Sequence, residues 1–512
     1  MTVRALQWSA PFVIALHTPL FLLSHNIAKT PANEACDAAA TSLLLAAVSL
    51  VLARRLVSSR AKAVALASGV MTWFFWFAVF SSAVHRAAGA TPAEVGEFNL
   101  ALIPWTILAA LYVVAVLRAR SADLLAQLWV IVAIVLVAAP ALVLLRFGVT
   151  RPPTPRPFPA VALRAPERMP DIFFLVFDRY AGAETLLRRY RFDNSGFIDH
   201  LRGRGFSVAE RSHANYQRTA HSLAATLNLE FIHPLYTGME HASDWRPLYA
   251  LVRDHRVGRS LRALGYEYVN AGAWWPPTRH PPLADVNLSF APFSSVLHAV
   301  YENSALAGSG FSFAGMLDVR RTQWQRIHRQ VREIGRIRRR ARPVFVFAHF
   351  LLPHDPYVFG ARGEFVPSRV AKERGIARNY IEQVQFANVV IRQLVDDLLA
   401  ELAEPRPVII IQADEGPFPP YEESEVDLNR YDWRRARPDE VREKFGILNA
   451  MYVPDAPRAS FNAAMTPINT FRIVFNTYFG QDLKLLPDRS FGSVSDVYPY
   501  GFFEVTDLLN AG

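Results

Sequence analysis

The pattern of apolar residues divides the chain into two parts near residue 150. In the first part, long apolar stretches alternate with short polar loops. A bilayer core of about 30 Å requires roughly 20 helical residues, and the last three stretches reach that length. The pattern predicts about five membrane spans and hence an N-terminal polytopic α-helical membrane domain. The expected spans are Trp8–Ser24, Ala38–Ala53, Ala63–Val84, Leu100–Leu117 and Leu124–Leu145.

After residue 170, short apolar runs alternate with segments of helical periodicity. Ile172–Phe177 is a continuous apolar run between two aspartates, which is typical of a buried parallel strand. The alternation predicts an α/β sandwich with a mostly parallel sheet. Further strands are expected at Phe206–Ala209, Tyr266–Asn270, Val344–His349 and Val408–Gln412, and helices at Ser195–Arg204, Val257–Leu264 and Tyr380–Ala403.

A proline-rich segment joins the two parts. Residues 152–170 contain seven prolines in nineteen positions, which favours extended polyproline geometry and a semi-rigid spacer. The expected organisation is therefore a transmembrane helical domain at 1–150, a linker at 151–170 and a second domain at 171–512.

Charge supports this division and orients the membrane part. Residues 1–150 hold ten Lys or Arg and five Asp or Glu, whereas the rest holds 45 and 40. With the N-terminus inside, the inner loops carry seven basic residues and the outer segments three, and five spans then place everything after Leu145 outside the cytoplasm. We expect a multi-pass protein of the cytoplasmic (inner) membrane with an extracytoplasmic second domain. The net charge of +10 is spread evenly and no nucleic-acid-binding motif occurs, which excludes that class of partner.

Polar residues that could carry chemistry follow three of the expected strands. Asp178 ends the first strand, His349 and His354 follow the strand at 344, and Asp414 and Glu415 follow the strand at 408. Active sites of such sheets lie beyond the carboxyl ends of the strands.

A hydroxyl completes this set. Thr219 opens an expected helix, whose N-terminus favours a phosphoryl group. Three carboxylates and a threonine can hold one hard divalent cation, which would lower the pKa of the threonine and leave an alkoxide able to attack phosphorus. Taken singly, these residues could be a helix cap, a core histidine and solvated loop charges. Their coincidence at strand ends favours the functional interpretation.

Four motifs in this order resemble the sulfatase-like branch of the alkaline phosphatase superfamily, over roughly residues 165–510. The motifs are PDIFFLVFD at 170–178, NYQRTAHS at 215–222, AHFLLPHDP at 348–356 and IQADEGP at 411–417. Spans followed by such a domain are similar in architecture to lipoteichoic acid synthases and phosphoethanolamine transferases. The resemblance implies an extracytoplasmic α/β sandwich of the alkaline phosphatase and sulfatase type.

The resemblance also implies roles for individual residues. Asp178 and Asp414 would bind the metal, Thr219 would be nucleophile and metal ligand, and His354 would contact the phosphoryl oxygens. Glu415 stands where the family usually has histidine. We expect it to be a fourth ligand that favours Mn²⁺ or Mg²⁺ over Zn²⁺ in a site for one divalent cation. Substrate-binding roles are expected for His349 and Arg218.

Three functions remain open from the sequence. The first is a membrane-anchored phosphotransferase that takes a headgroup from a phospholipid donor and passes it to an envelope glycan or lipid, all at the bilayer surface. The second is a phosphoester or phosphodiester hydrolase of the same fold. The third is a binding module of the same fold that has lost catalysis.

Overall fold

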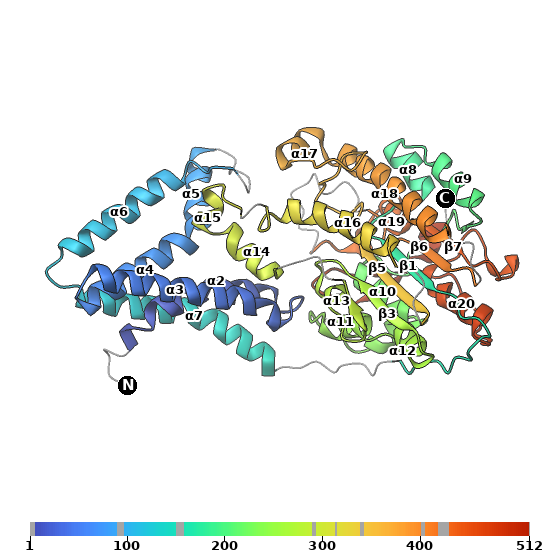
Figure 1. The fold of residues 1–512 in the computed structure, drawn as a ribbon, viewed down its shortest axis with the longest axis horizontal. Coiled ribbons are helices and arrows are strands. Elements are labelled where there is room, and N and C mark those ends of the chain that lie inside the picture. The colour runs from blue at the N-terminus through green and yellow to red at the C-terminus, as the bar shows by residue number, and fades with distance from the viewer. Residues whose placement is uncertain are drawn as a thin grey trace. The chain divides into compact units, whose positions relative to one another are not determined.

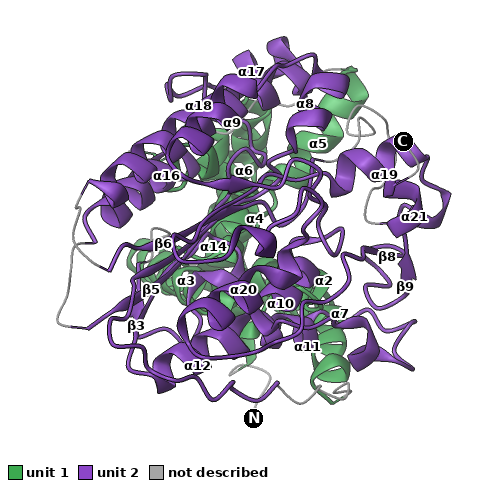
Figure 2. Cartoon of the chain, turned by 90° about the vertical axis from the view of Figure 1, so that its right-hand side faces the viewer, with its two compact units in different colours: residues 1–152, 291–322 green, residues 153–290, 323–512 purple. Residues whose placement is uncertain are grey.

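The computed structural model describes residues 6–89, 97–149, 158–288, 293–312, 315–337, 342–400, 405–417 and 430–510. It divides into two compact units, coloured separately in Figure 2. Unit 1 comprises residues 1–152 and 291–322, and unit 2 comprises residues 153–290 and 323–512. The sequence analysis counts 291–322 with the second domain, whereas the structure places this segment among the N-terminal helices.

Unit 1 is helical. Among its described residues, two helical stretches, Ala32–Leu56 and Asp123–Val149, are long and apolar enough to cross a membrane, and a bent pair makes a third if counted as one span. Two other expected spans form helices of 17 residues, α2 and α6, so two to three candidate spans are established rather than five. Its elements are α2 (Ala10–Asn26), η1 (Ala32–Ala35), α3 (Cys36–Leu56), α4 (Arg60–Phe75), α5 (Phe77–Ala88), α6 (Leu102–Arg118), α7 (Asp123–Val149), α14 (Ser295–Glu302) and α15 (Ala305–Gly308).

The expected span Ala63–Val84 is broken at Trp76, where α4 and α5 meet at 54°. The freed backbone N–H of Ala78 donates to the carbonyl of Asn303 at 3.2 Å, and a Cβ on Gly308 would collide with the Phe77 ring at 2.2 Å. Segment 303–308 therefore fills the break and satisfies its backbone. Non-helical backbone at membrane depth requires such a partner.

Unit 2 is built on a seven-stranded mixed sheet of order β2-β7-β6-β1-β5-β3-β4. The neighbours from β6 to β4 are parallel, in line with the expected mostly parallel sheet, whereas β7 and β2 join it antiparallel. Strand β2 falls on the expected strand Phe206–Ala209, while β4 and β7 are strands that the sequence pattern did not predict. The strands are β1 (Ile172–Phe177), β2 (Ser207–Val208), β3 (Glu267–Ala271), β4 (Val286–Asn287), β5 (Val344–Phe350), β6 (Val408–Gln412), β7 (Asn449–Tyr452), and a separate pair β8 (Phe491–Ser493) and β9 (Phe502–Glu504).

Helices cover both faces of this sheet (Figure 1). Alternate residues of β1 contribute to two different core clusters, because successive side chains of a strand point to opposite faces. One cluster includes α9, α16 and α18, and the other includes α10, α11, α12 and α20. The helices are α8 (Ala183–Tyr190), α9 (Ser195–Gly203), α10 (Thr219–Asn228), α11 (Arg246–Arg253), α12 (Arg256–Ala263), α13 (Pro276–Arg279), α16 (Val319–Gly335), α17 (Ser368–Arg374), α18 (Ile376–Leu399), α19 (Pro438–Phe445), α20 (Thr470–Tyr478) and α21 (Thr506–Asn510), with 3₁₀ turns at His233–Tyr236, Trp433–Arg435, Arg458–Ser460 and Pro467–Asn469.

The described part of the expected linker belongs to unit 2. Phe158, Val161 and Leu163 pack against the second core cluster, and the backbone N–H of Val161 donates to the Ser260 hydroxyl at 2.8 Å. Residues 151–157 of the linker lie outside the described residues. The segment from 158 onward is thus part of the folded domain rather than a spacer.

Candidate metal and phosphoryl-transfer site

The centre of the candidate site lies where three parallel strands end. Strand β1 pairs with β5 on one side and with β6 on the other, and Val176 is in register with both His349 and Gln412. Because parallel strands end at the same edge, Asp178, His349 and Asp414 converge there. Each side chain is buried. Sequence reasoning therefore places all three at the correct edge.

These three side chains form a cluster able to hold a metal ion. One ligand atom from each residue lies within 4.8 Å of the other two, and His349 Nε2 is 3.3 Å from Asp178 Oδ2. Among the described residues, no hydrogen bond of good geometry is formed by Asp178 Oδ1, His349 Nε2 or either Asp414 carboxylate oxygen, although His349 Nε2 lies near Asp178 Oδ2 and the Thr219 side chain lies near Asp414. Buried polar atoms without partners are costly, and a divalent cation would satisfy all of them at once. The donor set therefore fits a cation.

The orientation of His349 is set by a second residue. Its Nδ1 shares a hydrogen bond of 3.1 Å with the hydroxyl of Thr278, and this turns Nε2 toward Asp178. Histidines that bind metals usually have the other ring nitrogen held in this way. The sequence analysis assigned His349 to substrate binding, whereas the structure groups it with the two aspartates. Thr278 escaped sequence reasoning because it lies 71 residues away, on α13.

The two aspartates differ in their electrostatic surroundings. Burial tends to raise the pKa of Asp178, but His354, His349 and Arg179 act in the opposite direction and lower this pKa to about 2. For Asp414, burial and the charges of Asp178 and Glu415 raise the pKa well above its usual range. Asp178 therefore keeps its negative charge, whereas Asp414 holds its proton more tightly than an ordinary aspartate.

Thr219 lies at the N-terminus of α10 and beside the cluster. Its side chain is half-buried and comes close enough to Asp414 to lower the pKa of that carboxyl. Arg218 precedes it in an extended conformation, and no side chain caps the helix. The first backbone N–H groups of α10 are therefore directed at the position where an anion bound at Thr219 would lie.

Glu415 has cationic partners of its own. Its Oε1 is 2.8 Å from Lys444 Nζ and 3.2 Å from Arg179 Nε, and the side chains of Glu415 and Lys444 are 3% and 0% exposed. Burial lowers the pKa of Lys444 to about 8, against the raising effect of Glu415. Only Oε2 of Glu415 lacks a partner among the described residues. The structure thus gives this carboxylate two internal cations, and neither was singled out from sequence, because Lys444 lies 29 residues further along the chain.

His354 and Arg218 lie at the margin of the same site. His354 lowers the pKa of Asp178, and its Nδ1 lies 3.2 Å from a carboxylate oxygen of the neighbouring Asp355. Arg218 pairs with Asp496 at 2.7 Å, and its guanidinium lies over the Trp433 ring. The sequence analysis missed Asp496, since this contact joins residues 278 positions apart.

No protein-family model matches the chain, and no curated protein matches it. Solved structures do. The C-terminal periplasmic domain of EptC from Escherichia coli, in complex with Zn, matches with a TM-score of 0.42 and 10% identity, covering 65% of this chain and 93% of that one. The integral membrane lipooligosaccharide phosphoethanolamine transferase EptA from Neisseria meningitidis matches over 93% and 95% of the two chains, with a TM-score of 0.35 and 12% identity.

A sulfatase-like protein is also among the matches. YidJ of Bacteroides fragilis, described as a candidate sulfatase, covers 64% of this chain and 83% of its own, with a TM-score of 0.37 and 12% identity. The structural matches are therefore to membrane-anchored phosphoethanolamine transferases and to proteins of the sulfatase type.

Proposed function

We propose that this chain is a membrane-anchored, metal-dependent phosphotransferase that acts through Thr219. The observation that carries the proposal is the buried cluster of Asp178, His349 and Asp414, with oxygen and nitrogen atoms left unpaired, beside a threonine at a helix N-terminus. A binding module would have no need for a nucleophile in that position. The substrates we propose are a phospholipid donor and an envelope glycan or lipid acceptor.

The metal would be one divalent cation held by Asp178, His349, Asp414 and the Thr219 hydroxyl. When bound, it would lower the pKa of the hydroxyl and neutralise charge on the phosphoryl oxygens. The expectation of Mn²⁺ or Mg²⁺ over Zn²⁺ depends on a fourth carboxylate, Glu415. Because the cluster includes an imidazole nitrogen and Glu415 has its own cations, we propose Mn²⁺ or Zn²⁺.

The other steps of phosphoryl transfer are assigned to individual residues of the chain. The Thr219 hydroxyl loses its proton to solvent and its oxygen attacks phosphorus, a phospho-threonine forms, and the bond to the lipid alcohol breaks. His354, beside Asp178, contacts the phosphoryl oxygens and supplies the proton that the leaving alcohol needs. An acceptor hydroxyl then attacks phosphorus and gives up its proton to His354, and the freed Thr219 oxygen takes a proton back from solvent. The N-terminal N–H groups of α10 and Arg218 stabilise the negative charge during both steps.

The placement outside the cytoplasm is supported by contacts within unit 1. Residues 291–322 meet the two loops that the charge pattern assigns to the outer side. The backbone N–H of Ser294 donates to Asp37 Oδ2 at 2.8 Å, and that of Asn99 donates to the Gly308 carbonyl at 2.8 Å. We therefore propose five spans in the cytoplasmic membrane, with α2 and α6 among them, and an extracytoplasmic sheet domain.

A second candidate is a phosphoryl-binding module without turnover. It is favoured by Glu415, whose pairing with Lys444 and Arg179 occupies the position where the resembling family has a metal ligand. Hydrolysis, with water as the acceptor, remains a variant of the first proposal.

The test uses the full chain in lipid nanodiscs, loaded with Mn²⁺ or Zn²⁺, and phospholipids with a labelled headgroup. Thr219→Ala should abolish release of diacylglycerol, while Thr219→Ser, which keeps a hydroxyl, should retain turnover. Equal turnover of the wild type and Thr219→Ala would refute the mechanism, and no turnover by a metal-loaded wild type would favour the binding module. Mass spectrometry of the products separates transfer to a glycan or lipid from release of the free phosphorylated headgroup.

A further inference from the structure

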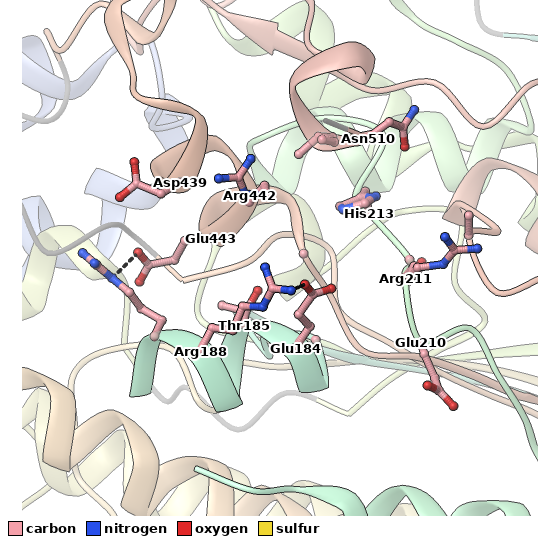
Figure 3. A pocket seen from close by; sticks show the side chains of 16 residues that line it. Glu184, Thr185, Arg188, Glu210, Arg211, His213, Asp439, Arg442, Glu443 and Asn510 are labelled. Atoms are coloured by element: carbon pink, nitrogen blue, oxygen red, sulfur yellow. Dashed lines mark ion pairs between the residues drawn. The ribbon is translucent and has the colours of Figure 1, made fainter. Parts of the chain in front are cut away.

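A second cavity in unit 2 lies apart from the metal cluster. It has a volume of about 330 Å³, is open to solvent on one side, and is lined by α8, residues 210–213, α19 and the C-terminal residues Leu509 and Asn510 (Figure 3). No member of the cluster at Asp178 lines it. The volume is within the range of small-ligand pockets. Its size suits a molecule about as large as a monosaccharide.

Of the described residues, four arginines and four carboxylates line this cavity, but they are not evenly paired. Two of the carboxylates pair with arginines of the cavity itself, at 3.0 Å each: Glu184 with Arg188, and Glu443 with Arg189. The other two pair with arginines that do not line it: Glu210 with Arg202, which also pairs with Asp199, and Asp439 with Arg437, which also pairs with Glu440.

Arg211 and Arg442 are the two arginines of the cavity without a carboxylate partner among the described residues. Within the described ranges neither forms an ion pair, and Arg442 reaches only the Leu508 carbonyl, at 3.5 Å. Figure 3 shows Arg211 next to His213, with Arg442 and Asn510 nearby. Two guanidinium groups without a carboxylate partner beside a cavity can bind an anion, and the planar fork of arginine matches phosphate and carboxylate.

The surroundings of these arginines are rigid and can bind hydroxyl groups. The Ser212 hydroxyl donates to the Met465 carbonyl at 2.7 Å, and a backbone bridge joins His213 to Gly446. Burial lowers the pKa of His213 to about 4, so its ring is neutral near pH 7 and offers one donor and one acceptor. The amide of Asn510 adds donors and an acceptor. The walls thus combine an anion-binding side with groups that suit a hydroxylated body.

We propose that this cavity is a binding site for a monosaccharide-sized organic anion that carries a phosphate or a carboxylate, held by Arg211 and Arg442. The site is separate from the phosphoryl-transfer site and does not depend on the proposed function.

Calorimetry on the full chain in detergent tests the proposal, using Thr219→Ala as the parent and EDTA to keep metal from the other site. The probes are glucose 6-phosphate, glucuronate, inorganic phosphate and uncharged glucose. We expect both sugar anions to bind more tightly than glucose or inorganic phosphate, and added salt to weaken them. The tighter of the two sugar anions identifies phosphate or carboxylate as the preferred group.

Arg211→Gln and Arg442→Gln should each weaken binding of the sugar anions by about ten-fold or more, since a charge-assisted hydrogen bond is lost. Arg378→Gln is the matched control. Arg378 is an exposed arginine on α18 that pairs with Glu382 and does not line the cavity, so binding should be unchanged. Because Arg211 is exposed, its substitution tests the site even if Arg442→Gln unfolds the protein. Sugar-anion binding that neither substitution weakens, or no binding at millimolar concentration, would overturn the proposal.

Discussion

Two groups of buried charged residues lie side by side at the edge of the sheet. They differ in whether the chain itself supplies the counter-charge. In the open cluster of Asp178, His349 and Asp414, carboxylate oxygens lack partners and the pKa of Asp414 is raised. In the closed cluster, Glu415 is neutralised by Lys444 and Arg179 from the same chain. Both groups are buried, so burial alone does not distinguish a binding site from a structural ion pair. What distinguishes them is whether the chain supplies its own counter-charge.

Removing a carboxylate from the open cluster should abolish metal binding and stabilise the metal-free protein. Asp414→Asn is expected to abolish binding of Mn²⁺ and Zn²⁺, measured as metal content after dialysis. It should also increase the free energy of unfolding of the metal-free protein, on the order of 1 kcal/mol, because it relieves repulsion with Asp178 and Glu415. This gain is measured as a higher melting temperature. Glu415→Gln is the comparison and should keep its metal. If Glu415→Gln lost the metal as completely as Asp414→Asn, Glu415 would belong to the open cluster.

Removing a charge from the closed cluster should instead lower the free energy of unfolding. Lys444→Met leaves Glu415 buried with only Arg179 as a partner, and we expect it to reduce the free energy of unfolding by about 3–5 kcal/mol. The double variant Lys444→Met/Glu415→Gln removes the stranded charge and should recover much of this loss. Denaturant unfolding in detergent measures both. A single variant as stable as the wild type would mean that the pair does not stabilise the fold.

Glu443, next to Lys444, provides a test through pH. Burial raises its pKa to about 7 from an ordinary value of 4.5, despite its pairing with Arg189. Between these values the unfolded chain has lost the proton that the folded protein keeps. The stabilisation is therefore fully present below pH 4.5 and is lost as the pH rises through 7, on the order of 3 kcal/mol at most. Glu443→Gln should flatten this part of the stability profile, and an unchanged slope between pH 5 and pH 8 would contradict the assignment.

The smallest expected effect concerns the hydrogen bond between Thr278 and His349, which orients one residue of the open cluster. Thr278→Val removes the hydroxyl that holds His349 Nδ1 and should weaken metal affinity by about ten-fold, with little change in the stability of the metal-free protein. Thr278→Ser, which keeps the hydroxyl, should bind metal as the wild type does. Equal affinities for Thr278→Val and the wild type in a metal titration would show that His349 is oriented by other contacts or does not bind the ion.

The sequence by itself determined the features that depend on local pattern. The change in charge density near residue 150 separated a helical membrane part from a sheet domain, since lipid and water select different side chains. The run Ile172–Phe177 predicted β1, and Asp178 and Asp414 followed as residues at the ends of parallel strands. Thr219 was placed at a helix N-terminus, where the structure has it.

Only the tertiary structure decided which charges meet. Residues 291–322 join the N-terminal helices because segment 303–308 fills a break at Trp76 that hydropathy reads as one continuous span. His349 faces the metal cluster because Thr278 holds its ring, and Glu415 is neutralised by Lys444 and Arg179. These contacts join residues 29 to 236 positions apart, beyond the reach of any helical or strand periodicity. Sequence pattern reports which face of an element is buried, whereas the counter-charge that a buried group receives depends on which elements the fold brings against it.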